Sequence, residues 1–203
     1  MITYFIIGIT ALVSYIAFTN RQLMENLQFN AAKIIHRKQY YRLISHALLH
    51  AGWTHLFVNM LVLLFFGVAV EQYFGYFFGR MAGAYFLLLY VGGTLFSNLI
   101  ALFRHKNNYY YNAIGASGAV AAVLFTFIFL NPWEKVYFFG IIPIPGIIFA
   151  GLYLLYSYQM SRKELDNVAH DAHFMGALFG FIFPVILRPH LFDRFIDQLF
   201  RMI

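Results

Sequence analysis

Residues 113–130 have the sequence AIGASGAVAAVLFTFIFL, an almost wholly apolar stretch. Its length is close to the roughly 20 residues that an α-helix needs to cross a bilayer. Near its start lies Gly115-Ala116-Ser117-Gly118, where small residues surround one hydroxyl group. Taken alone, these small residues are best explained by close packing of membrane helices. A serine at the start of a buried helix is also a candidate nucleophile, so the other polar residues of the chain decide between the two interpretations.

The composition extends the membrane prediction to the whole chain. Of its 203 residues, 62% are hydrophobic and 11% are charged, which leaves too little polar surface for a soluble domain. No apolar segment alternates with the period of two expected of a barrel strand. We therefore expect an all-α integral membrane protein, a single domain over residues 1–203 with six membrane-spanning helices. The spans are expected at residues 2–18, 52–70, 81–103, 113–130, 138–158 and 172–187.

The remaining segments and charges suggest membrane contacts. We expect the first span to be retained rather than cleaved as a signal, because no Lys or Arg precedes it and no small-residue cleavage site follows it. The long, charged connection at residues 19–51 is expected to form short amphipathic helices in the membrane interface. The net charge of +6 includes no basic run interleaved with aromatic residues, so lipids rather than nucleic acid are the expected partners. The absence of cysteine excludes disulfides and a cysteine nucleophile.

Polar residues recur near the beginnings of the second, fourth and sixth expected spans. Alternating spans of this order begin on the same side of the membrane. Ser117 and His173 each lie 15 residues before the residue that ends their span, which is roughly 22 Å along a helix axis. His55 and Asn59 lie one turn apart in the second span. The sequence therefore predicts that Ser117 and His173 meet at matched depth, as a catalytic pair requires.

Small residues provide for close approach of the helices that carry this pair. Gly176 and Gly180 share a helical face with His173, and Ala121 lies one turn after Ser117. A serine becomes an effective nucleophile when a neighbouring neutral imidazole accepts its proton. We therefore expect a Ser117–His173 dyad.

Hydrolysis of an amide also needs donors to the oxyanion that forms during attack. Candidates are the backbone N–H of Ser117, the amide of Asn59 and the ring N–H of His55. Polar groups inside a membrane are costly and are functional candidates by default. The alternative for His55 and Asn59 is a structural role, in which their hydrogen bonds tie helices together.

The joint order of these motifs resembles the rhomboid family of intramembrane serine proteases over nearly the whole chain. The matching motifs are His46-Ala-Leu-Leu-His50 with His55-Leu-Phe-Val-Asn59, Gly115-Ala-Ser117-Gly118, Ala172-His173-Phe-Met-Gly176, Tyr41-Arg42 and Glu71. The resemblance implies a six-helix bundle that hydrolyses a peptide bond in or next to the transmembrane helix of a membrane-protein substrate. It also implies that no metal or cofactor takes part, and that the fifth span and the loop before His173 act as gate and cap.

One position departs from the family pattern. Many members carry an aromatic residue one turn after the serine, where its ring stacks on the catalytic histidine, and this chain has Ala121 there. Phe125 and Phe174 are the candidates to replace that ring.

The orientation of the chain rests on the resemblance. It implies a multi-pass protein of a cell membrane, expected to be bacterial, with a cytoplasmic N-terminus and a site open to the outer face. The positive-inside count points the other way, since nine Lys and Arg residues lie on the expected outer side and five on the inner.

Two other classes of protein remain open from the sequence. A catalytically inactive rhomboid-like protein would bind membrane helices without cutting them, although the presence of both Ser117 and His173 argues against it. A membrane metal protein or transporter would use the histidines at positions 46, 50, 55, 170 and 173, but only Asp171 supplies a nearby carboxylate. His170-Asp171 also suggests a second candidate base. His173 is preferred because His170 lies one turn closer to the surface and Asp171 points about 160° away from His173.

Overall fold

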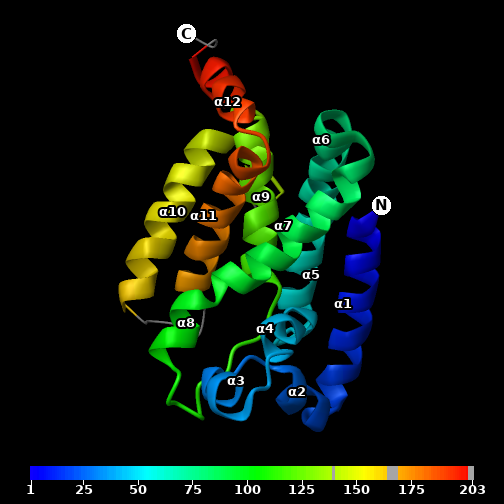
Figure 1. The fold of residues 1–203 in the computed structure, drawn as a ribbon, viewed down its shortest axis with the longest axis vertical. Helices are drawn as coiled ribbons and strands as arrows, with labels where there is room; N and C mark the ends of the chain where they lie inside the picture. The colour runs from blue at the N-terminus through cyan, green and yellow to red at the C-terminus, as the bar shows by residue number, and fades with distance from the viewer. Residues whose placement is uncertain (139, 164–168, 201–203) are drawn as a thin grey trace.

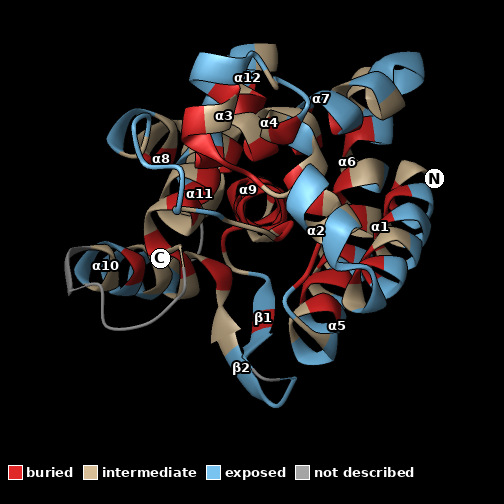
Figure 2. Cartoon of the chain, turned by 90° about the horizontal axis from the view of Figure 1, so that it is seen from below, coloured by how far each residue is buried: buried red, intermediate tan, exposed pale blue. Residues whose placement is uncertain are grey.

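A bundle of α-helices with one two-stranded sheet forms most of the protein (Figure 1). This computed structural model describes residues 1–138, 140–163 and 169–200. At the centre lies α9 (Ser117–Leu130), in which every residue after the first is buried (Figure 2). Helices α7 (Ala82–Ser97) and α11 (His170–Leu187) pack directly against it. The mostly helical architecture agrees with the expected fold class.

The first helix is followed by a series of short helices, as expected for residues 19–51. They are α1 (Ile2–Thr19), α2 (Arg21–Leu27), α3 (Ala31–Arg37), α4 (Arg42–Ser45) and a 3₁₀ turn (His46–Leu48). Asparagine side chains cap two of these helices, because Asn20 accepts from the Leu23 N–H and Asn30 from the Lys33 N–H, both at 2.9 Å. Arg42 is buried beneath them, where its Nη1 donates to the carbonyls of Glu25 at 2.9 Å and Gln28 at 2.7 Å.

The second expected span is a helix with an irregular middle. It comprises α5 (Trp53–Val62), a π-helical segment (Leu63–Gly67) and α6 (Val68–Phe78). Gly79, with a left-handed φ of 54°, begins the turn (Gly79–Met81) that leads back into α7 and α8 (Leu99–Arg104). Glu71 joins this arm to α1, since its carboxylate accepts from the N–H groups of Ile2 at 2.6 Å and Thr3 at 3.3 Å.

The expected fifth span begins later than its apolar sequence suggested. A hairpin occupies its first part, with β1 (Lys135–Phe138) antiparallel to β2 (Ile142–Pro145) and Phe138 paired with Ile142. Pro143 and Pro145 lack the N–H groups that a helix interior requires, and the hairpin tolerates both. The helix itself is α10 (Gly146–Lys163). After α11, a further amphipathic helix, α12 (His190–Phe200), lies beyond the last expected span.

Among the residues that the structure describes, three helical stretches are long and apolar enough to cross a membrane: Ile2–Thr19, Trp53–Arg104 and His170–Leu187. The second of these folds back at Gly79, so its two arms run side by side (Figure 1). The helix Ser117–Leu130 is apolar but shorter than the expected residues 113–130. Its shortening has a local cause, because Gly115 has a φ of 125° that no helix contains.

Candidate active site

Ser117 and His173 are brought together by the crossing of α9 and α11. Ser117 is the first residue of α9, and His173 lies in the first turn of α11. The Oγ of Ser117 lies 2.7 Å from the Nε2 of His173, which is a short hydrogen bond. Ser117 and His173 are therefore in contact, and their roles as nucleophile and base stay a prediction.

The glycine face of α11 sets this distance. A methyl group added at Gly176 would overlap the carbonyl of Gly118, and one added at Gly180 would overlap the carbonyl of Ala122. One turn further on, Thr126 Oγ1 donates to the Gly180 carbonyl at 2.7 Å. The two backbones are thus in direct contact, so the side chains above them have little freedom in how they meet.

Helix α7 packs against α9 in the same close way. A Cβ at Gly93 would lie 2.7 Å from the Ala122 Cβ and 3.2 Å from the Ala119 Cα. A Cβ at Gly118 would overlap the side chain of Ser97. Gly118 therefore has no room for a larger residue, which explains the small residue that follows the serine.

The loop before Ser117 is fixed by His46. The Gly115 N–H donates to the His46 carbonyl at 3.0 Å, and Asn98 Nδ2 donates to the His46 ring at Nε2 at 3.1 Å. Burial lowers the pKa of His46 to about 4, so the ring stays neutral and can accept this hydrogen bond. The sequence indicated His46 as part of a motif and as a candidate metal ligand, and the structure gives it a contact to the serine loop.

His55 lies beside the serine loop. A Cβ built at Gly115 would lie 2.9 Å from the His55 Cε1 and 3.2 Å from its Nε2, so this glycine leaves room for the ring. The Ala51 N–H approaches His55 Nδ1 at 3.5 Å, which favours the tautomer with the proton on Nε2. Asn59 is buried on the same helix, and its Nδ2 donates to the His55 carbonyl at 2.9 Å.

A further histidine, His50, packs against His55. Ser14 Oγ donates to the Leu48 carbonyl at 2.8 Å and lies 3.0 Å from His50 Nδ1, so it accepts the Nδ1 proton. The His50 ring meets the His55 ring edge-on, with centroids 4.9 Å apart. Burial, followed by the proximity of His55, lowers the pKa of His50 to about 3. Sequence reasoning had no signal for the contact with Ser14, which lies 36 residues away.

The ring that faces His173 comes from α10. Tyr153 lies 6.4 Å from the His173 ring between centroids, with 27° between the ring planes, and it packs against Phe125 at 5.4 Å. Neither of the two residues expected to replace the missing aromatic is the one beside His173. Phe125 lies behind Tyr153, and Phe174 is turned toward Tyr158 at 6.3 Å.

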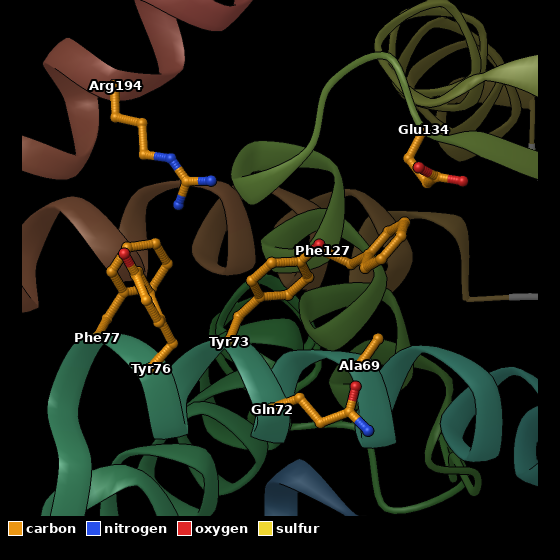
Figure 3. Close-up of a pocket in the computed structure, with 8 residues that line it drawn as sticks. All are labelled: Ala69, Gln72, Tyr73, Tyr76, Phe77, Phe127, Glu134 and Arg194. Carbon is orange, nitrogen blue, oxygen red and sulfur yellow. The ribbon is translucent and has the colours of Figure 1, made fainter.

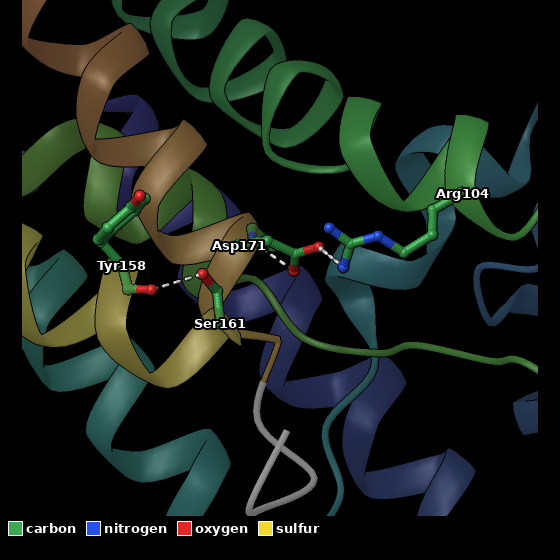
Figure 4. Close-up of polar contacts among 5 residues, drawn as sticks. Arg104, Tyr158, Ser161 and Asp171 are labelled. Carbon is green, nitrogen blue, oxygen red and sulfur yellow. Dashed lines mark hydrogen bonds and ion pairs between the residues drawn. The ribbon is translucent and has the colours of Figure 1, made fainter. Parts of the chain in front are cut away.

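Asp171 and His170 precede His173 in the first turn of α11. Asp171 Oδ1 accepts from the Ala172 N–H at 2.9 Å, and its Oδ2 lies 3.4 Å from Arg104 Nη1 at the end of α8 (Figure 4). The carboxylate is therefore directed toward α8. His170 is buried, and its ring meets the His173 ring edge-on at 6.0 Å.

These residues open onto a cavity of about 790 Å³. Its walls include Ser117, His173, His55, Arg104 and Asp171. Within the described part of the chain, no three His, Asp or Glu side chains are grouped as metal ligands would be, so the metal-protein alternative gains no support there. The arrangement combines a hydroxyl, an imidazole in contact with it and nearby N–H donors. These are the groups that acyl transfer requires.

Comparisons with known proteins cover most of the chain. The family model described as Rhomboid domain matches residues 37–190. RHOMBOID-like protein 4 of Arabidopsis thaliana is 32% identical over 163 residues, which are 78% of this chain and 37% of that protein. RHOMBOID-like protein 2 of the same plant is 31% identical over 159 residues, 77% of this chain and 46% of that protein. The chain spans less than half the length of these relatives.

Proposed function

The chain belongs to the rhomboid family, and from that membership we propose that it is an intramembrane serine endopeptidase. Its substrates are membrane proteins, cut at a peptide bond in or next to a transmembrane helix. The observation that carries the proposal is the 2.7 Å contact between Ser117 Oγ and His173 Nε2 at the wall of an open cavity.

The proposed enzyme crosses the membrane six times, with a cytoplasmic N-terminus and the catalytic cavity toward the outer face. The fold-back at Gly79 and the apolar character of α9 support the count. Because the chain has no cysteine, single cysteines introduced at Asn107 and at Arg188 report the two faces to an impermeant thiol reagent. Labelling of Asn107→Cys alone in intact cells is expected, and labelling of Arg188→Cys alone would reverse the orientation.

In the proposed mechanism, the Ser117 hydroxyl attacks the carbonyl carbon of the scissile peptide bond while His173 Nε2 accepts its proton. The C–N bond then breaks, and His173 returns the proton to the leaving amine. Water attacks the acyl-enzyme with His173 again acting as base, which releases the new carboxylate and restores the serine. No cofactor is needed for this sequence.

Three N–H groups are proposed to bind the oxyanion: the Ser117 backbone N–H, His55 Nε2–H and the amide of Asn59. One proton of the Asn59 amide is bonded to the His55 carbonyl, so the second is available to the substrate. Loss of one such donor costs about 10²- to 10³-fold in turnover. His55→Ala and Asn59→Ala are expected to lose activity in that range, and an unchanged turnover per folded molecule would assign them a structural role instead.

The decisive experiment compares the purified protein with Ser117→Ala, incubated in detergent with a generic single-span substrate. Product is expected from the unaltered protein and none from Ser117→Ala or His173→Ala, because each removes one half of the dyad. His170→Ala, the matched histidine control, should keep substantial activity. Absence of product from the folded, unaltered protein would support the inactive rhomboid-like alternative.

A further inference from the structure

A second cavity lies at the other end of α9 from Ser117. Phe127 forms part of its wall and lies ten residues after Ser117, which is roughly 15 Å along the helix. The cavity has a volume of about 790 Å³ and lies between α6, α9, the loop after α9 and α12 (Figure 3). The Ser117–His173 dyad contacts no part of it, so the catalytic proposal does not account for it.

One wall presents an arginine that lacks an acceptor. The Arg194 guanidinium of α12 lies over the Phe77 ring, with the central carbon 4.8 Å from the ring centroid. Its Nη1 is buried and has no hydrogen-bond partner among residues 1–138, 140–163 and 169–200. Arg194 lines the cavity, and a guanidinium with an N–H group left unpaired calls for an anionic oxygen from a ligand.

The opposite wall presents a carboxylate. Glu134 follows α9 and forms no ion pair with any residue of the described ranges. In Figure 3, the rings of Tyr73 and Phe127 lie between Glu134 and Arg194. A carboxylate beside aromatic faces suits an ammonium group. The two charged walls therefore fit a single ligand that carries an anion at one end and a cation at the other.

The position of the cavity indicates which molecule meets this description. Helices α6 and α9 both end here, and the indole of Trp133 donates to the Gln198 carbonyl at 3.1 Å. Trp, Tyr and Arg are typical of the headgroup level of a bilayer. Toward the middle of the membrane, Phe65 and Leu61 precede the cavity residue Ala69 and are 64% and 39% exposed. They offer an apolar surface to acyl chains on the helix that carries Ala69.

We propose that this cavity binds the headgroup of a zwitterionic phospholipid. The phosphate accepts from Arg194, and the ammonium lies between Glu134 and the aromatic rings. The site lies on the membrane face opposite to the catalytic cavity, and its occupancy is independent of whether the chain is a protease.

Lipid binding itself is the test. The protein is reconstituted in nanodiscs containing phosphatidylethanolamine and phosphatidylglycerol in equal amounts, and the lipids retained after transfer to detergent are counted by native mass spectrometry. We expect phosphatidylethanolamine to be retained preferentially. Arg194→Gln should reduce its retention about tenfold, through loss of a charged hydrogen bond. Glu134→Gln should shift the preference toward phosphatidylglycerol, because the groove then carries only positive charge.

Two control variants remove exposed charges elsewhere on the same face. Arg80→Gln, at the turn after α6, and Asp193→Asn, whose side chain is 76% exposed, should leave the lipid ratio unchanged. Equal retention of the two lipids by the unaltered protein would overturn the proposal. So would an unchanged ratio in Glu134→Gln, an exposed position where the substitution leaves the packing of the fold intact.

Two competitors distinguish other occupants. Soluble glycerophosphoethanolamine carries the headgroup without acyl chains, and it should compete only weakly. If it bound as tightly as the lipid, the cavity would be a site for free phosphodiesters. If a single-span peptide displaced the retained lipid while phosphatidylethanolamine showed no preference over phosphatidylglycerol, the cavity would be a polypeptide site. Either result would contradict the lipid assignment.

Discussion

Helices α9 and α10 are neighbours in the same bundle, but they are packed in opposite ways. From Gly118 to Leu130 every residue of α9 is buried, and its backbone touches α11 through Gly176 and Gly180. In α10 the large side chains of Leu152 and Leu155 are 57% and 55% exposed. Figure 1 shows the same contrast in position, with α9 at the centre and α10 at the margin.

The contrast separates two properties of the candidate site: the precision of its Ser117–His173 geometry, and the ease with which a substrate reaches it. The Ser117–His173 distance depends on backbone contacts between α9 and α11, which cannot change without disrupting the core. Of the rings of α10, that of Tyr153 faces His173, and the buried residues among the described side chains of this helix are Ala150 and Ser157. An element with few buried contacts is displaced at low cost. We therefore propose that movement of α10 widens the cavity and leaves the α9–α11 backbone contacts unchanged.

The largest effect should come from adding one methyl group to the tightly packed helix pair. Gly180→Ala places a Cβ on the Ala122 carbonyl and is expected to cost about 3 kcal/mol or more, since neither backbone can move aside. The matched change in α10, Gly151→Ala, meets nothing within 4 Å and should be neutral or slightly stabilising. Thermal unfolding in detergent compares the two. A similar loss in both variants would mean that the packing contrast between α9 and α10 has no energetic counterpart.

The next effect concerns pH and the loop that begins α9. Buried His46 has a pKa of about 4 in the folded protein and 6.5 when unfolded, so the unfolded chain binds more protons between these values. Its contribution is complete above pH 6.5 and is lost as the pH falls toward 4, by about 3 kcal/mol in total. His46→Gln should make this dependence shallower, measured by denaturation from pH 7 to pH 4, while His50, whose pKa is also lowered by burial, supplies a further part of it.

The exposed histidine of α12 provides the control for that measurement. His190→Gln should keep the pH dependence of the unaltered protein, since its ring is 90% exposed. If stability fell with pH at the same slope in the unaltered protein, His46→Gln and His190→Gln, His46 would not contribute to the pH dependence.

Much of the closely packed region formed by α9 and α11 was predictable from the sequence. The spacing of His173, Gly176 and Gly180 places a polar residue and two glycines on one helical face, and local periodicity is enough to detect such a face. Matched positions in alternating spans then predicted the meeting of Ser117 and His173. The short helices after α1 followed in the same way from a charged segment with interspersed apolar residues.

The region formed by the hairpin and α10 was not predictable in this way. The apolar run at residues 138–158 looks like one helix, but Pro143 and Pro145 direct its first part into a hairpin. Tyr153 is one of many tyrosines, and only the packing of α10 against α11 identifies it as the residue facing His173. Arg104 and Asp171 are 67 residues apart. Contacts between distant segments of this kind leave no periodic trace in one sequence.

A smaller effect is expected from the ring of α10 that faces His173. Tyr153→Ala should lower turnover about tenfold, equivalent to about 1.4 kcal/mol, because the His173 ring loses the surface against which it is held. Tyr153→Phe keeps the ring and should restore most of the activity. The loss should appear in kcat rather than KM, since Tyr153 positions the base. An equal loss in the Phe variant would mean that the hydroxyl, rather than the ring, is needed.

The smallest effect is expected at the N-terminal end of α11, where Asp171 meets Arg104. The two side chains are 3.4 Å apart, and that of Arg104 is 48% exposed, so water competes for the pair. Such pairs contribute less than about 1 kcal/mol. Asp171 Oδ1 also accepts from the Ala172 N–H, and asparagine retains an oxygen for that bond. Asp171→Asn should therefore keep turnover within about threefold and lower the unfolding temperature only slightly. Activity at the level of His173→Ala would instead show that the carboxylate acts on His173, which its direction toward α8 argues against.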